Sequence, residues 1–257
     1  MPCLQGRRVR RFFLEGISRD DRSVCVRGDE FYHLARVLRL KEHAEVALFD
    51  GRGLELSGTI AALDDEQARI EVTGVSEGGG ESPLEITLLQ AVTKGGKMDL
   101  IIQKGTEIGV ASFRPFFSDR TVPKAGAGAK AGAKRSARWR KIALEAAKQC
   151  GRSVIPAIGE PAPFEEVLAG FDDALKLMPW EMEQERGLRE TVRDYGKAGV
   201  EKAAILIGPE GGLTEEDVAT ARRHGFMAVS LGPRILRAET AAIAAIAVVQ
   251  HCLGDMG

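Results

Sequence analysis

The chain has 257 residues, of which 44% are hydrophobic and 28% are charged. This composition is typical of a globular protein and excludes a wholly disordered or fibrous chain. The 36 lysines and arginines nearly balance the 37 aspartates and glutamates, so the net charge of -1 excludes nucleic-acid binding through bulk positive charge. The longest apolar run, residues 241–249, is much shorter than the ~20 residues that cross a bilayer, and we expect no membrane span.

The cysteines and the first residues bear on the cellular compartment. Cys3, Cys25, Cys150 and Cys252 lie far apart, without the Cys-x-x-Cys spacing of a zinc or redox site or the density of a disulfide scaffold. The basic residues within 7–11 are followed by too few apolar residues for a signal peptide. We therefore expect a cytoplasmic protein in a reducing compartment, without a bound metal.

The charges are unevenly distributed along the chain. Residues 120–141 include eight basic residues and no acidic one, and within them residues 125–134 read AGAGAKAGAK, which predicts a loop. A single basic run is often only a solvated linker. Further basic clusters at 7–11 and 33–41 favour the alternative, a phosphate-rich partner bound along one side of the molecule.

Short periodic segments make up the first third of the chain. They predict a helix at 28–38 and strands at 45–49, 54–61 and 68–73. Asp50-Gly51 is a hairpin signal between the first two of these strands. The pattern indicates a small β-barrel, and the polar, glycine-rich stretch SEGGGESP at 76–83 predicts a linker after it.

Strand-like and helix-like segments alternate after this linker. The predicted strands are 84–91, 112–116, 174–178, 203–207 and 227–231, and the predicted helices are 98–108, 137–149, 184–195, 215–224 and 239–252. Such alternation is typical of a mostly parallel sheet covered by helices, so the second domain is predicted to be α/β.

A glycine-rich loop at 208–212, with the sequence GPEGG, follows the strand predicted at 203–207. Glycines at the carboxyl end of a parallel strand let the backbone approach a ligand closely. The loop lacks both the GxGxxG and the GK[ST] fingerprints, and Glu210 would repel a phosphate, so a dinucleotide or ATP is disfavoured. A plain strand-to-helix turn is the alternative interpretation.

A second Gly-Pro loop, residues 231–237, follows the last predicted strand. The two loops can face each other at one edge of the sheet and form a pocket between them. In the alternative interpretation, Arg234 and Arg237 pair with Glu239 or with helix carboxylates on the surface, as isolated arginines commonly do.

Two further polar segments are less specific. Lys97 and Lys104 are seven residues apart and share one stripe of the helix predicted near 98–108, which is typical of a solvated face. Cys150-Gly151-Arg152 is typical of a helix cap followed by a surface arginine. A reactive Cys150 would need an activating partner that the sequence does not identify.

Six segments together resemble one known family. They read RVLRLKEHAEVALFDG, KGGKMDLIIQKGTEIGV, SDRTV, WRKIALEAAKQCGR, LIGPEGGLTEEDV and LGPRILRAETA, and they cover nearly the whole chain in this order. In order and spacing they resemble the bacterial family that methylates N3 of a uridine in 16S ribosomal RNA. This family is a branch of the SPOUT class of knotted S-adenosylmethionine-dependent methyltransferases.

The resemblance implies a fold, a division into domains and partners. It implies a PUA-like RNA-binding β-barrel at 1–75, the linker at 76–83, and a SPOUT-type α/β domain at 84–257 that contains a deep trefoil knot. It also implies a homodimer formed through the knotted domain, with 16S ribosomal RNA or the small ribosomal subunit as substrate. The helix at 241–249 is apolar over most of its circumference, which supports burial between its own sheet and a second copy.

The resemblance also implies the cofactor and its site. S-adenosylmethionine would bind three loops, one after each of three strands. Carried over to this chain, the cofactor-binding residues are Leu177, Met178, Pro179, Gly208, Pro209, Glu210, Gly211, Gly212, Leu231, Gly232, Ile235, Leu236 and Arg237. The run Met178-Pro179-Trp180-Glu181 departs from the more aliphatic or tyrosine-containing sequence of many family members, and Ala238 replaces a common threonine.

Methylation at N3 requires removal of the imide proton and an unpaired or flipped uridine, because N3 lies on the pairing edge. We expect Arg237 to stabilise negative charge that develops on a uracil oxygen, and Glu210 or Glu239 to act as the base. The residues expected to contact RNA phosphates are Arg10, Arg11, Arg36, Arg39, Lys97, Lys104, Arg120 and Arg152. Two other functions stay open: a ribosome-assembly factor that only binds RNA, and a less favoured oxidoreductase or nucleotide-dependent enzyme.

Overall fold

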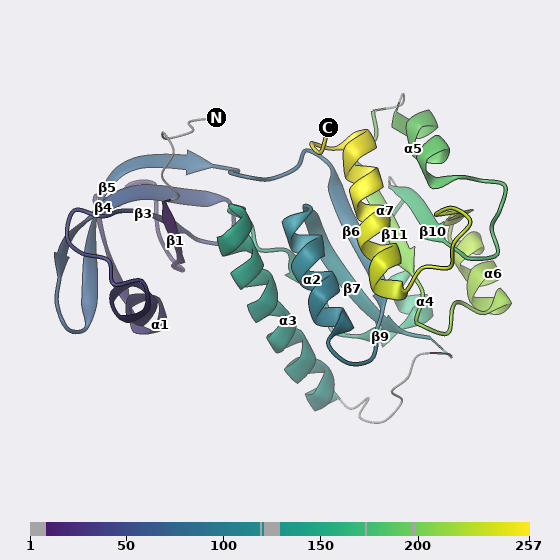
Figure 1. The fold of residues 1–257 in the computed structure, drawn as a ribbon, viewed down its shortest axis with the longest axis horizontal. Helices are drawn as coiled ribbons and strands as arrows, with labels where there is room; N and C mark the ends of the chain where they lie inside the picture. The colour runs from purple at the N-terminus through teal and green to yellow at the C-terminus, as the bar shows by residue number, and fades with distance from the viewer. Residues whose placement is uncertain (1–8, 119, 121–128, 173, 197–198) are drawn as a thin grey trace. The chain divides into compact units, whose positions relative to one another are not determined.

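The computed structural model describes residues 9–118, 120, 129–172, 174–196 and 199–257. The chain forms two compact units (Figure 1). Residues 1–81 and 147–155 make the first unit, and residues 82–146 and 156–257 make the second. The segment 147–155 therefore belongs with the N-terminal unit. The predicted domains, divided only at the linker 76–83, do not include this return of the chain to the first unit.

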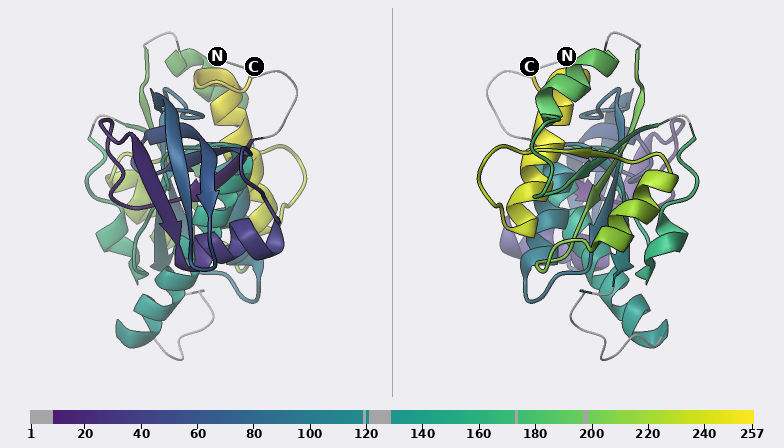
Figure 2. Two further views of the ribbon diagram at one scale, coloured as in Figure 1. Left: turned by 90° about the vertical axis from the view of Figure 1, so that its left-hand side faces the viewer. Right: turned by 90° about the vertical axis from the view of Figure 1, so that its right-hand side faces the viewer.

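A curled five-stranded sheet forms the first unit (Figure 2). Its strands lie in the order β1 (Arg10–Phe13), β3 (Glu45–Phe49), β4 (Leu54–Leu63), β5 (Gln67–Glu77) and β2 (Ser23–Arg27). The β1–β3 pair is parallel and the other pairs are antiparallel. The predicted strands β3, β4 and β5 are confirmed, whereas β1 and β2 were not predicted.

One short helical stretch covers the core of this sheet. It consists of α1 (Gly28–Tyr32) followed directly by the π-helix η1 (His33–Val37), where the sequence predicts a single helix. Phe31 and Leu34 from this stretch pack among the buried side chains of the strands, including Phe12, Leu48 and Ile70. The apolar face of the helix therefore completes the core of the first unit.

Residues 78–81 and 151–155 are bound to each other within the first unit. Arg152 is only 4% exposed, and its Nε and Nη2 donate hydrogen bonds of 3.1 and 2.7 Å to Oε2 of Glu81. The backbone N–H of Val154 donates to Oε1 of the same carboxylate at 2.9 Å. Arg152 was expected to contact RNA, but its burial and its pairing with Glu81 give it a structural position instead.

A parallel sheet forms the second unit, as the alternating pattern predicts. Its strands follow the order β12 (Met227–Val229), β10 (Leu175–Pro179), β11 (Lys202–Ile207), β6 (Glu85–Ala91), β7 (Val110–Phe117) and β8 (Ala157–Ile158), with β9 (Ala162–Pro163) paired to β7. All of these pairs are parallel. Strands close in sequence are thus not always neighbours in the sheet, since β10 lies between β11 and β12.

Six helices are described in the rest of the chain. They are α2 (Lys97–Glu107), α3 (Ala129–Cys150), α4 (Phe164–Val167), α5 (Leu188–Gly196), α6 (Glu215–Arg223) and α7 (Ala238–Leu253). The loop expected at 125–134 is wrong from residue 129 onward, because alanine and lysine favour a helix enough to accommodate Gly132. Residues 125–128 lie outside the described residues.

The C-terminal helix α7 has one buried face and one half-exposed face, and both are apolar. Ala242, Ala245, Ile246 and Val249 are fully buried against the second unit. On the other side, residues 243, 244, 247 and 248 are also apolar but only half-buried. Helix α7 packs against α2 and α5, and Figure 1 shows it beside both of them.

The described residues contain neither a membrane-spanning helix nor a cluster of metal-ligating side chains. No helix in the described ranges is long and apolar enough to cross a membrane. In the same part of the chain, no group of three or more histidine, cysteine, aspartate or glutamate side chains could hold a metal ion.

The Arg152–Glu81 pair generates a stability prediction. We expect Arg152→Met to lower the free energy of unfolding by ~3 kcal/mol, because it leaves a carboxylate in a half-buried position without its cation. Denaturant unfolding followed by circular dichroism measures this change. The double variant Arg152→Met, Glu81→Gln should recover part of the loss, and equal stability of wild type and Arg152→Met would contradict a structural role.

Candidate active site

Three loops meet where β10, β11 and β12 end. Because these strands are parallel neighbours, their carboxyl ends lie at the same edge of the sheet. Two adjoining cavities open there, of about 300 and 540 Å³. They share Pro179, Glu181, Ile235, Leu236 and Ala241 in their walls. The loop after β10 thus separates the two Gly-Pro loops, and all three form one continuous site.

The Gly208–Gly212 loop has a conformation that requires glycine. Gly212 has a φ of +73°, and a Cβ atom at this position would overlap Oε1 of Glu181. The backbone N–H of Gly212 donates a hydrogen bond of 2.9 Å to the carbonyl of Pro209, which closes the turn. Glycine at position 212 therefore allows the loop after β11 to approach the loop after β10.

The glycine loop leads directly into helix α6. Thr214 is the N-cap of this helix, and its hydroxyl accepts a hydrogen bond of 3.0 Å from the backbone N–H of Asp217. Asp217 in turn accepts from the N–H of Thr214 at 2.9 Å, which completes a capping box. The helix start is fixed in this way, and it holds the loop in front of it.

The Leu231–Arg237 loop forms the other side of the site. Gly232 has a φ of +101°, and Ile235 is 89% exposed at the rim of both cavities. Arg237 is the N-cap of α7 and lines the smaller cavity. Its guanidinium makes no ion pair or hydrogen bond within the described part of the chain, and Glu239 faces Lys97 instead. The alternative interpretation, in which Arg237 pairs with Glu239, is therefore wrong.

Lys97 lies between two carboxylates at the smaller cavity. Its Nζ is 3.2 Å from Oε1 of Glu210 and 3.6 Å from Oε2 of Glu239. Lys97 is the first residue of α2, where a positive charge interacts unfavourably with the helix dipole. Its charge therefore does not stabilise α2. It was expected to contact RNA, but its ammonium instead joins the glycine loop to the start of α7.

Glu210 is held in its ionised form. Burial by itself would raise the pKa of Glu210, but hydrogen bonds from its own backbone N–H, from the N–H of Lys94 and from the Lys97 ammonium outweigh this effect. The pKa of Glu210 therefore lies below its ordinary value of 4.5. At neutral pH the carboxylate keeps its charge, and its hydrogen bonds fix the position of the loop.

Glu239 differs from Glu210 in its surroundings. Its side chain is 13% exposed, and it does not line either cavity. Oε2 of Glu239 is buried without a hydrogen-bond partner among the described residues. Glu239 thus supports Lys97 from behind the cavity wall.

Family models match both parts of the chain. An RNA methyltransferase domain matches residues 80–250, and an RNA methyltransferase PUA domain matches residues 26–73. The ribosomal RNA small subunit methyltransferase E of Bacillus subtilis is 30% identical over 229 residues, which cover 88% of this chain and 89% of that protein. The chain belongs to this RNA methyltransferase family.

Other relatives and solved structures agree with this membership. The family member from Synechocystis is 33% identical over 87% of this chain and 71% of its own length. A Neisseria gonorrhoeae ribosomal RNA small subunit methyltransferase E bound to S-adenosyl methionine has a TM-score of 0.85 and 32% identity, with 97% of this chain and all of that chain covered. A Legionella pneumophila methyltransferase solved with its bound cofactor has the same TM-score, identity and coverage.

Not all residues expected in the family's cofactor site reach the cavities. Pro179, Leu231 and Gly232 line them, but Leu177 and Met178 are fully buried inside β10 and line neither. Their side chains point into the core, so any contact of these two residues with the cofactor would be through the backbone, and this part of the expectation stays a prediction. The cavity walls also contain residues that were not expected there, among them Trp180, Glu181, Ile207 and Leu213.

Gly211 and Arg120 form a separate contact beside the site. Gly211 lines neither cavity, and its carbonyl accepts a hydrogen bond of 3.0 Å from Nη1 of Arg120. Arg120 is exposed, so this hydrogen bond places a positive charge against the outer side of the glycine loop.

The remaining basic residues expected to bind RNA divide into two groups: those held close to a carboxylate of this chain, and those exposed on the first unit. Arg11 is paired with Glu55 and lies 4.8 Å from the centre of the Phe49 ring, with only 11% of its side chain exposed. Lys104 pairs with Glu107 on its own helix at 2.8 Å and is about two-fifths exposed. The second group, Arg10, Arg36 and Arg39, is exposed on the first unit. Burial removes Arg11 from a phosphate-binding surface.

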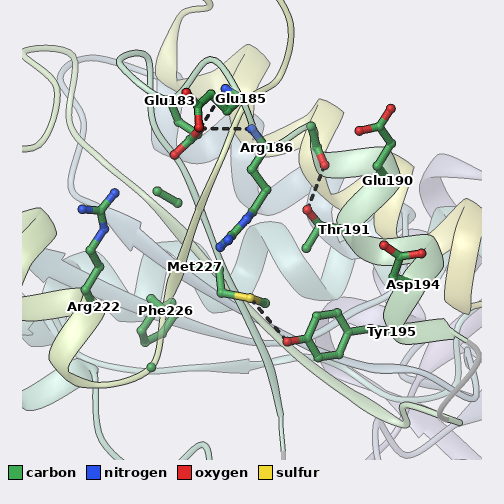
Figure 3. A pocket seen from close by; sticks show the side chains of 13 residues that line it. Glu183, Glu185, Arg186, Glu190, Thr191, Asp194, Tyr195, Arg222, Phe226 and Met227 are labelled. Atoms are coloured by element: carbon green, nitrogen blue, oxygen red, sulfur yellow. Dashed lines mark hydrogen bonds between the residues drawn. The ribbon is translucent and has the colours of Figure 1, made fainter.

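A larger cavity of the second unit lies elsewhere. Figure 3 shows this open cavity of about 800 Å³ between α5 and the start of β12. Four carboxylates line it, and only Arg186 and Arg222 oppose them. The glycine loops and the carboxyl ends of the strands do not contribute, so size alone does not identify the active site.

The lowered pKa of Glu210 predicts a pH dependence. Ionisation of Glu210 stabilises the fold above the ordinary pKa of the group, and this contribution is lost as the pH falls through the lower pKa of the folded protein. We expect wild type to be more stable than Glu210→Gln at pH 7, with the difference shrinking in acid. Thermal unfolding of both proteins from neutral to acidic pH measures this. A difference that does not change with pH would contradict the assignment.

Proposed function

We propose that this chain transfers the methyl group of S-adenosylmethionine to N3 of a uridine in 16S ribosomal RNA. The single observation that carries the proposal is the meeting of the two Gly-Pro loops in the walls of one site. The membership in the RNA methyltransferase family supports the reaction class, and the cofactor-bound relatives support the choice of methyl donor.

The residues at the site fit this cofactor. Gly212 has no Cβ, so the loop after β11 closes against the carboxylate of Glu181 and both residues form the wall of the smaller cavity. Ile207, Leu213 and Leu236 offer apolar walls for an adenine ring, and the carboxylates of Glu181 and Glu210 suit a positively charged sulfonium. When bound, S-adenosylmethionine supplies an electrophilic methyl group at this position.

The side chains of the cavity account for the chemistry at the uridine. Loss of the N3 proton places negative charge on the uracil oxygens, and the unpaired guanidinium of Arg237 stabilises it. Of the two carboxylates proposed as base, Glu210 is the one that lines the cavity in which the uracil would bind. Its lowered pKa makes it a weak base, so the positioning of the reactants and the charge of Arg237 carry most of the rate enhancement.

The proposal extends to both units and to the assembly. The first unit, with the PUA-like barrel at 1–75, would bind the substrate RNA in the small ribosomal subunit, and residues 84–257 would form the SPOUT domain with its trefoil knot. The half-exposed apolar face of α7 supports a homodimer through this domain. The site of action would be the cytoplasm, where the ribosomal RNA is found.

The proposed function has a direct test. Mass spectrometry of 16S ribosomal RNA from cells with and without the gene should show one methylated uridine that is lost on deletion. Restoration by the wild-type gene and not by an Arg237→Ala copy would tie the modification to this site. Identical modification in both strains would refute the function.

Gly212→Ala tests the cofactor site. We expect a loss of S-adenosylmethionine affinity of at least ten-fold, because a left-handed φ strains alanine by ~1–2 kcal/mol and its Cβ displaces Glu181. Isothermal titration calorimetry on the folded variant measures the affinity. Gly225→Ala is the matched control, since Gly225 has a φ of +86° but lies before β12, at the other edge of the sheet. Unchanged affinity in Gly212→Ala would exclude the loop from the site.

Arg237→Ala tests the catalytic step. We expect kcat to fall about 10²- to 10³-fold, the usual effect of removing one donor that stabilises a developing anion. Methyl transfer to small ribosomal subunits measures the rate, and calorimetry should show cofactor binding close to that of wild type. Arg237→Lys should restore part of kcat, because it returns the charge without the fixed geometry. Undiminished turnover in Arg237→Ala would end its proposed role.

A further inference from the structure

One exposed surface of the first unit combines an aromatic ring with exposed positive charge. We name it the Tyr32 face, and it consists of Tyr32, Arg36, Val37, Arg39 and Lys41. Tyr32 is 62% exposed and Val37 is 56% exposed, whereas Phe31 and Leu34 of the same helical stretch are buried. The side of α1 and η1 that does not pack on the sheet therefore presents a ring to solvent instead of the polar residues usual there.

The backbone under this face is irregular. η1 is a π-helix, and the N–H of Leu38 donates a hydrogen bond of 2.9 Å to the carbonyl of His33, five residues earlier. In the described part of the chain, Arg39 and His43 are the only non-glycine residues with positive φ, at 51° and 69°. Both lie in the loop that follows η1. Such conformations cost free energy and gather at functional positions.

The positive charges of the Tyr32 face are only weakly compensated by carboxylates of this chain. Arg36 is 62% exposed, and its guanidinium is 3.9 Å from the fully exposed carboxylate of Asp65, too far for a hydrogen bond. Arg39 and Lys41 are exposed and make no ion pair within the described residues. Three exposed cations thus follow Tyr32 within nine residues of the chain, and phosphates can neutralise them.

We propose that the Tyr32 face binds an unpaired segment of the substrate RNA, with a base stacked on the Tyr32 ring and phosphates held by Arg36 and Arg39. An exposed aromatic ring flanked by cations is the arrangement that recognises single-stranded nucleic acid. Arg36 and Arg39 lie on either side of Val37 in the sequence, so exposed apolar residues alternate with cations, which favours RNA over an apolar protein partner. The inference rests on the proposed function and assigns its RNA contact to particular residues.

The test compares two substitutions at Tyr32. Fluorescence anisotropy is measured with a short labelled RNA hairpin that has an unpaired loop, and with a fully paired duplex of the same length. Tyr32→Ala should raise the Kd for the hairpin about ten-fold, because one stacked base is lost, and should change the duplex Kd much less. Tyr32→Phe keeps the ring and should bind within about two-fold of wild type.

The charges are tested by the salt dependence of binding. Arg36→Gln and Arg39→Gln should each reduce the slope of log K against log salt by about 0.7 for a single strand. Arg19→Gln is the matched control, because Arg19 pairs with Glu77 and Arg36 faces Asp65. Asp65 lies just before β5 and Glu77 is its last residue, so the two arginines lie at opposite ends of this strand. The control should leave the slope unchanged.

Activity separates this inference from the proposed function. In Tyr32→Ala, the KM for small ribosomal subunits should rise about ten-fold while kcat and the cofactor affinity stay at the wild-type values. If wild type fails to methylate the subunits, the proposed function fails. If wild type methylates them and Tyr32→Ala has the same KM and hairpin Kd, or if Tyr32→Phe is as weak as Tyr32→Ala, stacking on the Tyr32 face is refuted.

Discussion

Three parallel strands, β10, β11 and β12, are neighbours in one sheet, and the site depends on this order. Each strand delivers the loop that follows it to the same edge, so segments about 30 residues apart in the chain share one cavity. Beyond this, the loops require only a glycine, Gly212, where the loop after β11 comes closest to the loop after β10. The capping box of α6 and the start of α7 then hold two of them from behind.

The second organising feature is a charge cluster. Lys97 comes from α2, Glu210 from the loop after β11 and Glu239 from α7, so one ammonium connects three segments that have no covalent link nearby. The partly buried pairs are worth more than exposed ones, because water screens them less. The cluster carries a net negative charge, which suits a cationic methyl donor, while Arg237 adds a positive charge to the wall of the same cavity.

Local signals in the sequence predict much of this fold, and long-range contacts account for what they miss. The hairpin at Asp50-Gly51 and the βα alternation are local patterns, and both are confirmed. Strand β1 reads RRFF without alternation and is defined by its parallel pairing with β3. Strand β2 reads SVCVR with Val24 and Val26 toward the core, a local signal that the prediction did not use. Exposure cannot be read from residue type: Arg11 and Arg152 are buried beside Glu55 and Glu81, whereas Arg36 is exposed. The spacing of the two Gly-Pro loops predicted that they meet, but not the role of Lys97.

The exposed side chain of Ile235 has a thermodynamic consequence. An aliphatic group in water at the rim of two cavities gains up to ~2 kcal/mol when it is covered. Any molecule that fills either cavity and shields Ile235 adds this gain to its own affinity. If the methyl donor and the flipped base each cover part of the same side chain, the first to arrive changes the hydration that the second encounters. Their affinities are then linked, and a single residue makes the two binding steps cooperative.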